Sequence, residues 1–404
     1  MNRTFEKHDD DIVIVAGART AIGRFGGSLK DVSAIDLGAT VVAEAVERAG
    51  IDPAEVDELV VGQVGGWGPN GFVARAVGLK AGLPNETCAY SVNRQCGSGL
   101  QAIVEAVMEI RCGASEVVVA GGTENLSQLP YYVTDARWGA RMGHKRFEDG
   151  VIDILTWPLD ESHNGVTAEN VAREFNVTRE EQDEFAARSQ QRAVKAVADG
   201  VFADEIVAVN VPGRKGAVTV VDTDENPRDG VTAEGLARLK PCFVFDGTGT
   251  VTAANSSSLN DAAAAVVVMT RAKAAELGCE PMATIRGWAV AGYDAALMGY
   301  SPFLSTKKLA EQLDIDPAEV GFFELNEAFA SQAVAVSRDL GLDPERVNVY
   351  GGGISLGHPI GATGAVLALK CAYELGRRHP EKGDAMVSMC IGGGQGISMY
   401  FTAG

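Results

Sequence analysis

Four side chains that could carry out chemistry lie in short motifs far apart in the sequence: Cys96 in NRQCGSG, Asn326 in NEAFA, His358 in GHPIGATG and Cys390 in CIGGGQG. A thiol can act as a nucleophile, and an imidazole can remove its proton. A second thiol can move another proton, and an amide can hold a water that stabilises an oxyanion. Two proton-handling groups are one more than acyl hydrolysis needs. The set therefore favours carbon–carbon bond formation, which must also remove a proton alpha to a carbonyl.

Each of these residues also has an ordinary structural interpretation. A free Cys is more often a small buried apolar side chain than a nucleophile, and Asn is a frequent helix N-cap. A lone His is more often hydrogen-bonded without a catalytic role, and Cys390 could simply pack at the end of a buried strand. The glycine-rich runs do not indicate a dinucleotide site, because neither gives GxGxxG between a strand and a helix.

The elements around Cys96 predict a sharp turn between a strand and a helix. Residues 87–92 have an extended pattern, and apolar residues recur at helical spacing over 100–107 until Cys112-Gly113 ends the helix. We therefore expect Cys96 in the first turn of a helix, where free backbone N–H groups and the positive helix end favour a thiolate. His358 is expected just before another helix.

An internal repeat divides the chain into two similar parts. The six residues 51–56, IDPAEV, return unchanged at 315–320, and each copy leads into an apolar run. Ser98-Gly99 has a counterpart in Thr363-Gly364, again at the start of an apolar helix. Such a repeat predicts two duplicated α/β halves with parallel strands covered by helices. A pseudo-twofold arrangement would bring Cys96 of one half towards the loops of the other.

The segment between the two parts has a different character. Residues 128–245 contain an aromatic and basic loop, a helical stretch at 171–199 and a polar run, with no counterpart in the second part. Insertions of this kind often cover a substrate on α/β scaffolds. We expect 1–127 and 246–271 to form the first half, 128–245 an inserted loop domain, and 272–404 the second half.

Composition limits the possible partners. The chain of 404 residues has 35 Lys and Arg against 54 Asp and Glu, a net charge of −19, which disfavours nucleic acid and anionic lipid. No apolar run approaches the roughly 18 residues needed to cross a membrane, and the first residues are polar and acidic. The seven Cys are dispersed without a CxxC pair, which predicts a cytoplasmic protein without a metal site.

The motifs and their order resemble those of the thiolases, coenzyme A-dependent acyltransferases that make or cleave 3-oxoacyl-CoA. The resemblance covers nearly the whole chain and rests on NRQCGSG, GGTEN, TAEN, NEAFA, GHPIGATG and CIGGGQG. It implies an α/β fold: a layered α/β/α/β/α sandwich of two duplicated halves, each with a five-stranded mixed sheet. It also implies an inserted loop domain that binds coenzyme A and makes oligomer contacts.

The resemblance assigns roles to the matching positions. Cys96 would take the acyl group, His358 would accept its proton, and Cys390 would move the proton at the alpha carbon. One oxyanion hole would use His358 and a water held by Asn326, and the other the backbone N–H groups of Cys96 and Gly392. The coenzyme A and acyl channel would be lined by His163, Asn164, Arg228, Ala253, Ser257, Met298 and Phe329.

The family also sets expectations about ligands and assembly. Acetyl-CoA, coenzyme A and 3-oxoacyl-CoA would be substrates, and no cofactor would be tightly bound. Family members are homodimers or homotetramers, and residues 131–143 resemble the segment that makes tetramer contacts.

Two departures from the family pattern concern the acyl group. Asn164 stands where the family usually has Met, and residues 301–304, SPFL, replace a common Gly-Pro-x-Pro. They predict a preference for a more polar or bulkier acyl group than acetoacetyl. The sequence leaves the acyl chain and the physiological direction open.

Two other functions remain as alternatives. A decarboxylating condensing enzyme of the same fold would lack the second thiol, so Cys390 argues against it. A non-catalytic thiolase-like protein that binds acyl-CoA or lipid would be expected to have lost a catalytic residue, and none is lost here.

Overall fold

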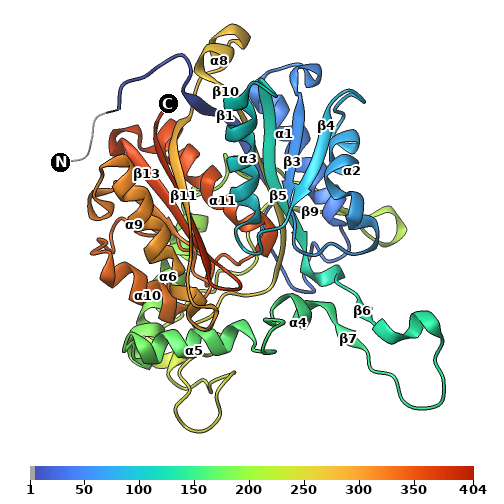
Figure 1. Ribbon diagram of the computed structural model, residues 1–404, viewed down its shortest axis with the longest axis vertical. Helices are drawn as coiled ribbons and strands as arrows, with labels where there is room; N and C mark the ends of the chain where they lie inside the picture. Colours follow the sequence, from blue (N-terminus) through green and yellow to red (C-terminus); the bar gives the residue numbers. More distant parts are fainter. Residues whose placement is uncertain (1–4) are drawn as a thin grey trace.

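The computed structural model describes residues 5–404. One continuous mixed sheet runs across the molecule (Figure 1). In spatial order its strands are β12 (Phe322–Leu325), β13 (Asp384–Ile391), β14 (Gln395–Ala403), β11 (Ala283–Gly292), β1 (Ile12–Arg19), β10 (Asn260–Thr270), β5 (Val117–Asn125), β3 (Glu58–Gly62) and β4 (Cys88–Val92), with β2 (Gly23–Arg24) beside β10.

The sheet consists of two halves with matching connections. In the first half β3 pairs in parallel with β4 and β5, and β10 is antiparallel to β5 and β1. In the second half β12 is parallel to β13, and β14 is antiparallel to β13 and β11. Only two residue pairs, Val13–Thr284 and Ile14–Ala283, join β1 to β11. The two half-sheets therefore meet edge to edge.

The expected duplicated α/β fold is confirmed, with one difference in detail. The first half has five strands from β4 to β1, as expected. Among the described residues the second half has four named strands. A single parallel bridge between Phe323 and Val347 extends its outer edge, where a fifth strand was expected. The chain there is too briefly paired to form a regular strand.

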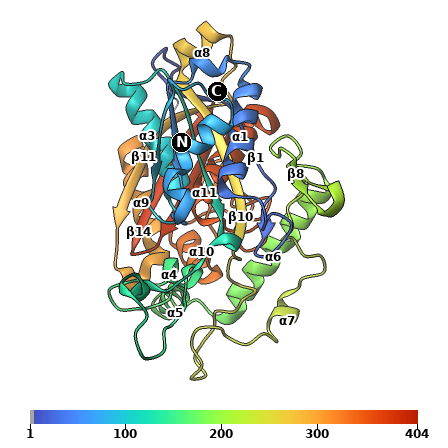
Figure 2. The ribbon, with the colours of Figure 1, turned by 90° about the vertical axis from the view of Figure 1, so that its right-hand side faces the viewer.

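Helices form three layers around the half-sheets (Figures 1 and 2). The central layer contains α3 (Ser98–Cys112) and α11 (Ile360–Tyr373), whose buried side chains share one core with strands of both halves. Helices α1 (Ala34–Ala49) and α2 (Val73–Lys80) cover the outer face of the first half. Helices α9 (Ser301–Leu313) and α10 (Ala330–Asp339) cover that of the second.

The sequence repeat has the same local structure in both copies. Each copy contains a single 3-10 turn, Pro53–Glu55 or Pro317–Glu319. The side chain of the preceding residue, Asp52 or Asp316, accepts the first free N–H at 2.9 or 3.0 Å. Both turns lead into a parallel strand, β3 or β12. The duplication inferred from sequence is therefore present in the fold.

Most of the remaining elements lie between β5 and β10. They are β6 (Tyr131–Tyr132), β7 (Glu148–Asp149), α4 (Gly150–Ile154), α5 (Asn164–Glu174), α6 (Arg179–Ala198), β8 (Val209–Pro212), β9 (Val218–Val221) and α7 (Ala233–Leu236), and α8 (Arg271–Leu277) follows β10. The helical stretch expected at 171–199 is two helices. Asn176 has φ 51°, which breaks the first, and Thr178 caps the second with a capping box. Over residues 5–404, no helix is long and apolar enough to cross a membrane.

Candidate functional site

The starts of α3 and α11 meet in the central layer. A Cβ added at Gly99 would lie 2.8 Å from the backbone nitrogen of Ala365, and one at Gly364 would overlap the backbone nitrogen of Leu100. Only glycine allows two backbones to approach this closely. The turns before the two helices carry Cys96 and His358. These turns therefore lie side by side, although 262 positions, 358 − 96, separate the two residues in sequence.

Cys96 lies two residues before α3, so the expectation that it occupies the first helical turn is wrong. The preceding Gln95 has φ 46°, which turns the chain sharply and leaves Gly97 as the helix N-cap. The Cys96 side chain is buried, and its sulfur accepts a hydrogen bond from the backbone N–H of Gly392. This contact brings the glycine-rich turn after β13 against the thiol.

The environment of Cys96 does not favour a thiolate in the free protein. Burial raises the pKa of the thiol to about 11, the Gly392 hydrogen bond opposes this shift, and the nearby Glu124 carboxylate adds to it. The expected effect of the helix start is therefore outweighed by desolvation. Cys96 is a protonated thiol at neutral pH and needs a base to react.

Cys390 is the last residue but one of β13 and is fully buried. Burial raises the pKa of its thiol well above the usual range, and the charge of Cys96 raises it further. The two thiols are therefore close enough to influence each other electrostatically. A residue that only packed at a strand end, remote from Cys96, would not do so.

His358 is held as a neutral imidazole with one nitrogen available. Its backbone N–H donates to Asn260 Oδ1 at 2.8 Å, and its Nδ1 lies 2.6 Å from Thr363 Oγ1. The Nε2 atom is buried and has no hydrogen-bond partner within residues 5–404. Burial lowers the pKa of the ring to about 4, so the ring is uncharged at neutral pH.

Asn326 follows β12 and does not cap a helix. Helix α10 begins only at Ala330, after Phe329, so the N-cap interpretation is wrong. The backbone N–H of Asn326 donates to the Ser388 carbonyl, and the side chain is 1% exposed. Neither polar atom of its amide has a partner in the described part of the chain. The amide is thus free to bind a water or a substrate atom.

The other residues predicted for the channel fall into two groups. Met298 and Phe329 pack with Cys390 in one buried cluster. The His163 ring stacks on Phe243 at 5.1 Å between centroids, and Asn164 Nδ2 lies 3.8 Å from the position of a Cβ on Gly392. This group lies around Cys390 and the glycine-rich turn that follows it.

The second group comprises Arg228, Ala253 and Ser257. Arg228 and Ala253 line one cleft together with Ser256 and Ser258. The N–H of Ser257 donates to the carbonyl of Ala328, beside the NEAFA phenylalanine. Arg228 and Ala253 therefore share a cleft whose lining includes neither Cys96 nor Cys390.

Sequence reasoning missed several neighbours of this site. The Trp157 ring would touch a side chain at Gly393, and Phe243 packs edge to face on Phe329 with centroids 6.3 Å apart. Thr363 and Asn260 fix His358. Of these neighbours, only Thr363 could have been found from the sequence, because it lies five residues after His358 within the same motif.

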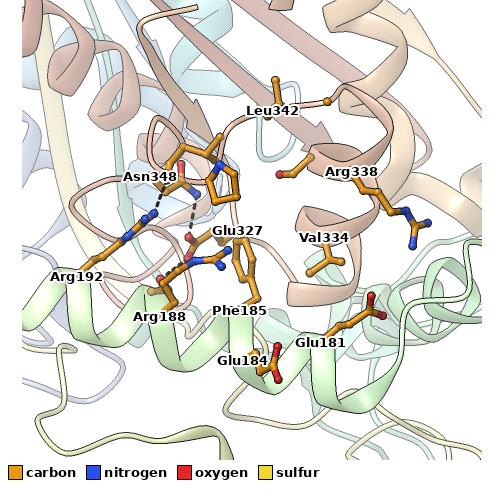
Figure 3. Close-up of a pocket in the computed structure, with 15 residues that line it drawn as sticks. Glu181, Glu184, Phe185, Arg188, Arg192, Glu327, Val334, Arg338, Leu342 and Asn348 are labelled. Carbon is orange, nitrogen blue, oxygen red and sulfur yellow. Dashed lines mark hydrogen bonds between the residues drawn. The ribbon is translucent and has the colours of Figure 1, made fainter. Parts of the chain in front are cut away.

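A separate cleft of about 440 Å³ lies between α6 and α10 (Figure 3). Arg188, Phe185 and Leu342 line it, and Glu327 closes its inner end. The Glu327 carboxylate accepts hydrogen bonds from Ser189 Oγ and Asn348 Nδ2, at 2.7 and 2.8 Å. The cleft therefore ends behind the NEAFA motif, and none of the residues predicted for the site lines it.

Residues 5–404 contain no group of three or more His, Cys, Asp or Glu that could hold a metal ion.

Comparisons with known families and proteins agree over almost the whole chain. The model of the thiolase N-terminal domain matches residues 12–272, and that of the thiolase C-terminal domain matches 279–403. The acetyl-CoA acetyltransferase of Pseudomonas aeruginosa is 48% identical over 96% of this chain and 98% of its own length. The beta-ketothiolase BktB of Cupriavidus necator is 47% identical over 97% of this chain and 98% of its own length.

Solved structures agree as well. The Bacillus anthracis acetyl-CoA acetyltransferase has a TM-score of 0.94 and 43% identity, with 98% of this chain and 100% of that chain covered. The human mitochondrial 3-ketoacyl-CoA thiolase has a TM-score of 0.93 and 37% identity, with 98% of this chain and 99% of that chain covered.

Fold, site and relatives together define a coenzyme A-dependent acyltransferase. The chain belongs to the thiolase family.

Proposed function

We propose that this protein makes or cleaves 3-oxoacyl-CoA by Claisen condensation and thiolysis, with the acyl group carried on Cys96. Acetyl-CoA, coenzyme A and 3-oxoacyl-CoA are the substrates, as the names of the relatives suggest. The observation that carries the proposal is the Gly392 N–H bonded to the Cys96 sulfur. It brings the turn that follows Cys390 against Cys96, with a backbone donor that can bind an oxyanion.

In the first half-reaction His358 Nε2 takes the proton of Cys96, and the sulfur attacks the thioester carbonyl. The neutral ring and its free Nε2 support this role, with the Nδ1–H donating to Thr363. The backbone N–H groups of Cys96 and Gly392 receive the oxyanion. The carbon–sulfur bond to coenzyme A then breaks, and the leaving thiolate takes the proton from His358.

In the second half-reaction Cys390 exchanges the proton at the alpha carbon. His358 Nε2 first takes the proton of the Cys390 thiol, whose strongly raised pKa makes its thiolate basic enough to remove a weakly acidic proton. The enolate oxygen would be stabilised by the Nε2–H of His358 and by a water on Asn326, whose amide has no partner among the described residues. The alpha carbon then attacks the acyl carbonyl, and the released Cys96 sulfur takes the proton from His358.

The cleft lined by Arg228 and Ala253 fits an anionic coenzyme on an acidic protein. Arg228 supplies a cation there beside Ala253, while Ser257, His163 and Asn164 lead inwards to Met298 and Phe329. We assign this binding role to an inserted domain at 128–245, between a first half at 1–127 with 246–271 and a second half at 272–404.

We also propose a cytoplasmic homodimer or homotetramer. All seven Cys are free, which suits a reducing compartment. Tyr131, Trp138 and Met142 are exposed in and beside the hairpin of β6 and β7, which extends from the body in Figure 1. Exposed apolar side chains grouped in this way support a contact with another subunit.

Acyl-enzyme formation tests the proposal directly. Mixing the protein with acetyl-CoA should add one acetyl group to Cys96, and steady-state rates should follow ping-pong kinetics, because coenzyme A leaves before the second substrate binds. Peptide mass spectrometry locates the group. A requirement for malonyl-CoA would indicate a decarboxylating condensing enzyme, and binding without acyl transfer a non-catalytic protein.

Asn164→Met should shift acyl preference towards apolar chains. The Asn164 amide has no hydrogen-bond partner within residues 5–404 and faces Gly392. A polar group left unpaired by an apolar substrate costs about 1 to 3 kcal/mol, enough for a tenfold change. The measurement is the ratio of kcat/KM for acetoacetyl-CoA to that for a 3-oxoacyl-CoA with a polar chain. An unchanged ratio would show that Asn164 does not select the acyl group.

A further inference from the structure

Glu124, the last residue but one of β5, has a carboxylate that the proposed mechanism does not use. It is 1% exposed, and within residues 5–404 it forms no ion pair with Lys, Arg or His. A buried carboxylate without a cation needs hydrogen-bond donors. The hydrogen-bond donors that Glu124 has in the described part of the chain are backbone N–H groups.

Three backbone groups, two from the loop after β3 and one from the first turn of α11, donate to this carboxylate. Oε2 accepts from Val64 N–H at 3.1 Å and from Gly361 N–H at 2.9 Å, and Oε1 accepts from Gly65 N–H at 2.9 Å. Gly361 lies in the first turn of α11, three residues after His358. Such a position carries one of the free donors of a helix start. Glu124 therefore fixes the start of α11 to the end of β5.

Two glycines are required by this arrangement. A Cβ at Gly361 would lie 2.7 Å from Glu124 Oε2, and one at Gly65 would lie 2.8 Å from Oε1. The loop that contains Gly65 and the start of α11 that contains Gly361 are thus in close contact with the carboxylate. Since His358 Nδ1 is held by Thr363 of the same helix, the position of α11 determines the position of the imidazole.

We infer that Glu124 is a positioning residue, which in its ionised form holds the His358 turn against the Cys96 turn. The inference rests on the proposed function for the roles of His358 and Cys96. A protonated carboxyl presents an O–H where it now accepts, so at least one of the three backbone bonds is lost.

Glu124 changes its protonation state near neutral pH. Burial raises its pKa to about 7, against the effect of the three backbone hydrogen bonds, and Asp261 on β10 raises it further. Asp261 is bonded to Ser127, and burial raises its own pKa to about 6. The other titratable neighbours are Cys96 before α3 and His358 before α11. His358 titrates near pH 4, so its protonation does not lower the reaction rate near pH 7.

The experiment measures kcat, and separately alkylation of Cys96 by iodoacetamide, against pH for the full-length protein. In the parent both rates should fall as pH drops below about 7, because protonated Glu124 releases the His358 turn. Glu124→Gln should lower kcat by about 10- to 100-fold through the lost hydrogen bonds, and remove this acid limb. Glu124→Asp keeps an ionisable group. Its kcat should be lower than that of the parent but should still fall as the pH drops.

Two variants serve as controls. Glu374→Gln removes an equally buried carboxylate just beyond the far end of α11, bonded to Tyr350 and Lys382, and should keep the parent profile. Asp261→Asn should keep the fall in rate but move it to lower pH, because the Asp261 charge raises the pKa of Glu124. A kcat of Glu124→Gln within about twofold of the parent, or an unchanged limb in that variant, would overturn the inference. Alkylation needs no substrate, so it decides the role of Glu124 even where no acetyl group reaches Cys96.

Discussion

Cys390→Ala should still form acetyl-Cys96 but should lose condensation and cleavage by about 10²- to 10⁴-fold. His358 can accept the Cys96 proton without the second thiol, so the first half-reaction survives. The alpha proton of an acetyl thioester is weakly acidic, and water cannot replace a positioned base. Cys96→Ala should lose acetylation altogether. The two measurements are the yield of acetyl-enzyme and the condensation rate of each variant.

A matched control separates chemistry from packing. Cys371→Ala removes another fully buried thiol, in α11, and should cost only stability, by about 1 kcal/mol or somewhat more. Near-normal condensation by Cys390→Ala would show that this thiol only packs. Loss of acetylation in that variant would show that Cys390, rather than His358, activates Cys96.

His358→Ala should slow acetylation of Cys96 by about 10²- to 10⁴-fold at pH 8, the typical contribution of a general base. In the parent the ring is neutral from pH 8 to 10, since its pKa is about 4, so the rate should be level there. Without the ring only the thiolate reacts. Because the Cys96 pKa is about 11, the thiolate fraction and the rate should rise about tenfold per pH unit.

Single-turnover acetylation between pH 8 and 10 measures this slope. Glu374→Gln again controls for a buried change on the same segment. A level profile in His358→Ala would mean that another group removes the Cys96 proton. A rising profile in the parent would mean that His358 is not the base.

Much of the fold could be predicted because its signals are local or repeated. The IDPAEV repeat indicated two halves, and apolar spacing placed α3 and its end at Gly113. What escaped prediction depends on contacts between distant segments. The joining of β1 to β11 involves two residue pairs, and no periodicity marks them.

The chemical state of the site could not be predicted for the same reason. The motif located Cys96, but the left-handed Gln95 moved it out of the helix, and burial rather than the helix dipole sets its pKa. Glu124 was visible only as part of GGTEN. Its three donors come from residues 64, 65 and 361, which are neighbours only in the folded chain.

The position of β10 affects how the protein can be made. It lies between β1 and β5, although β1 ends at residue 19 and β10 begins at residue 260. During translation, the facing edges of β1 and β5 have no partner until residue 270 has left the ribosome, which takes roughly tens of seconds. Unpaired strand edges recruit other chains. The nascent first half therefore has two unpaired strand edges through most of its synthesis, and a chain truncated before β10 is expected to aggregate.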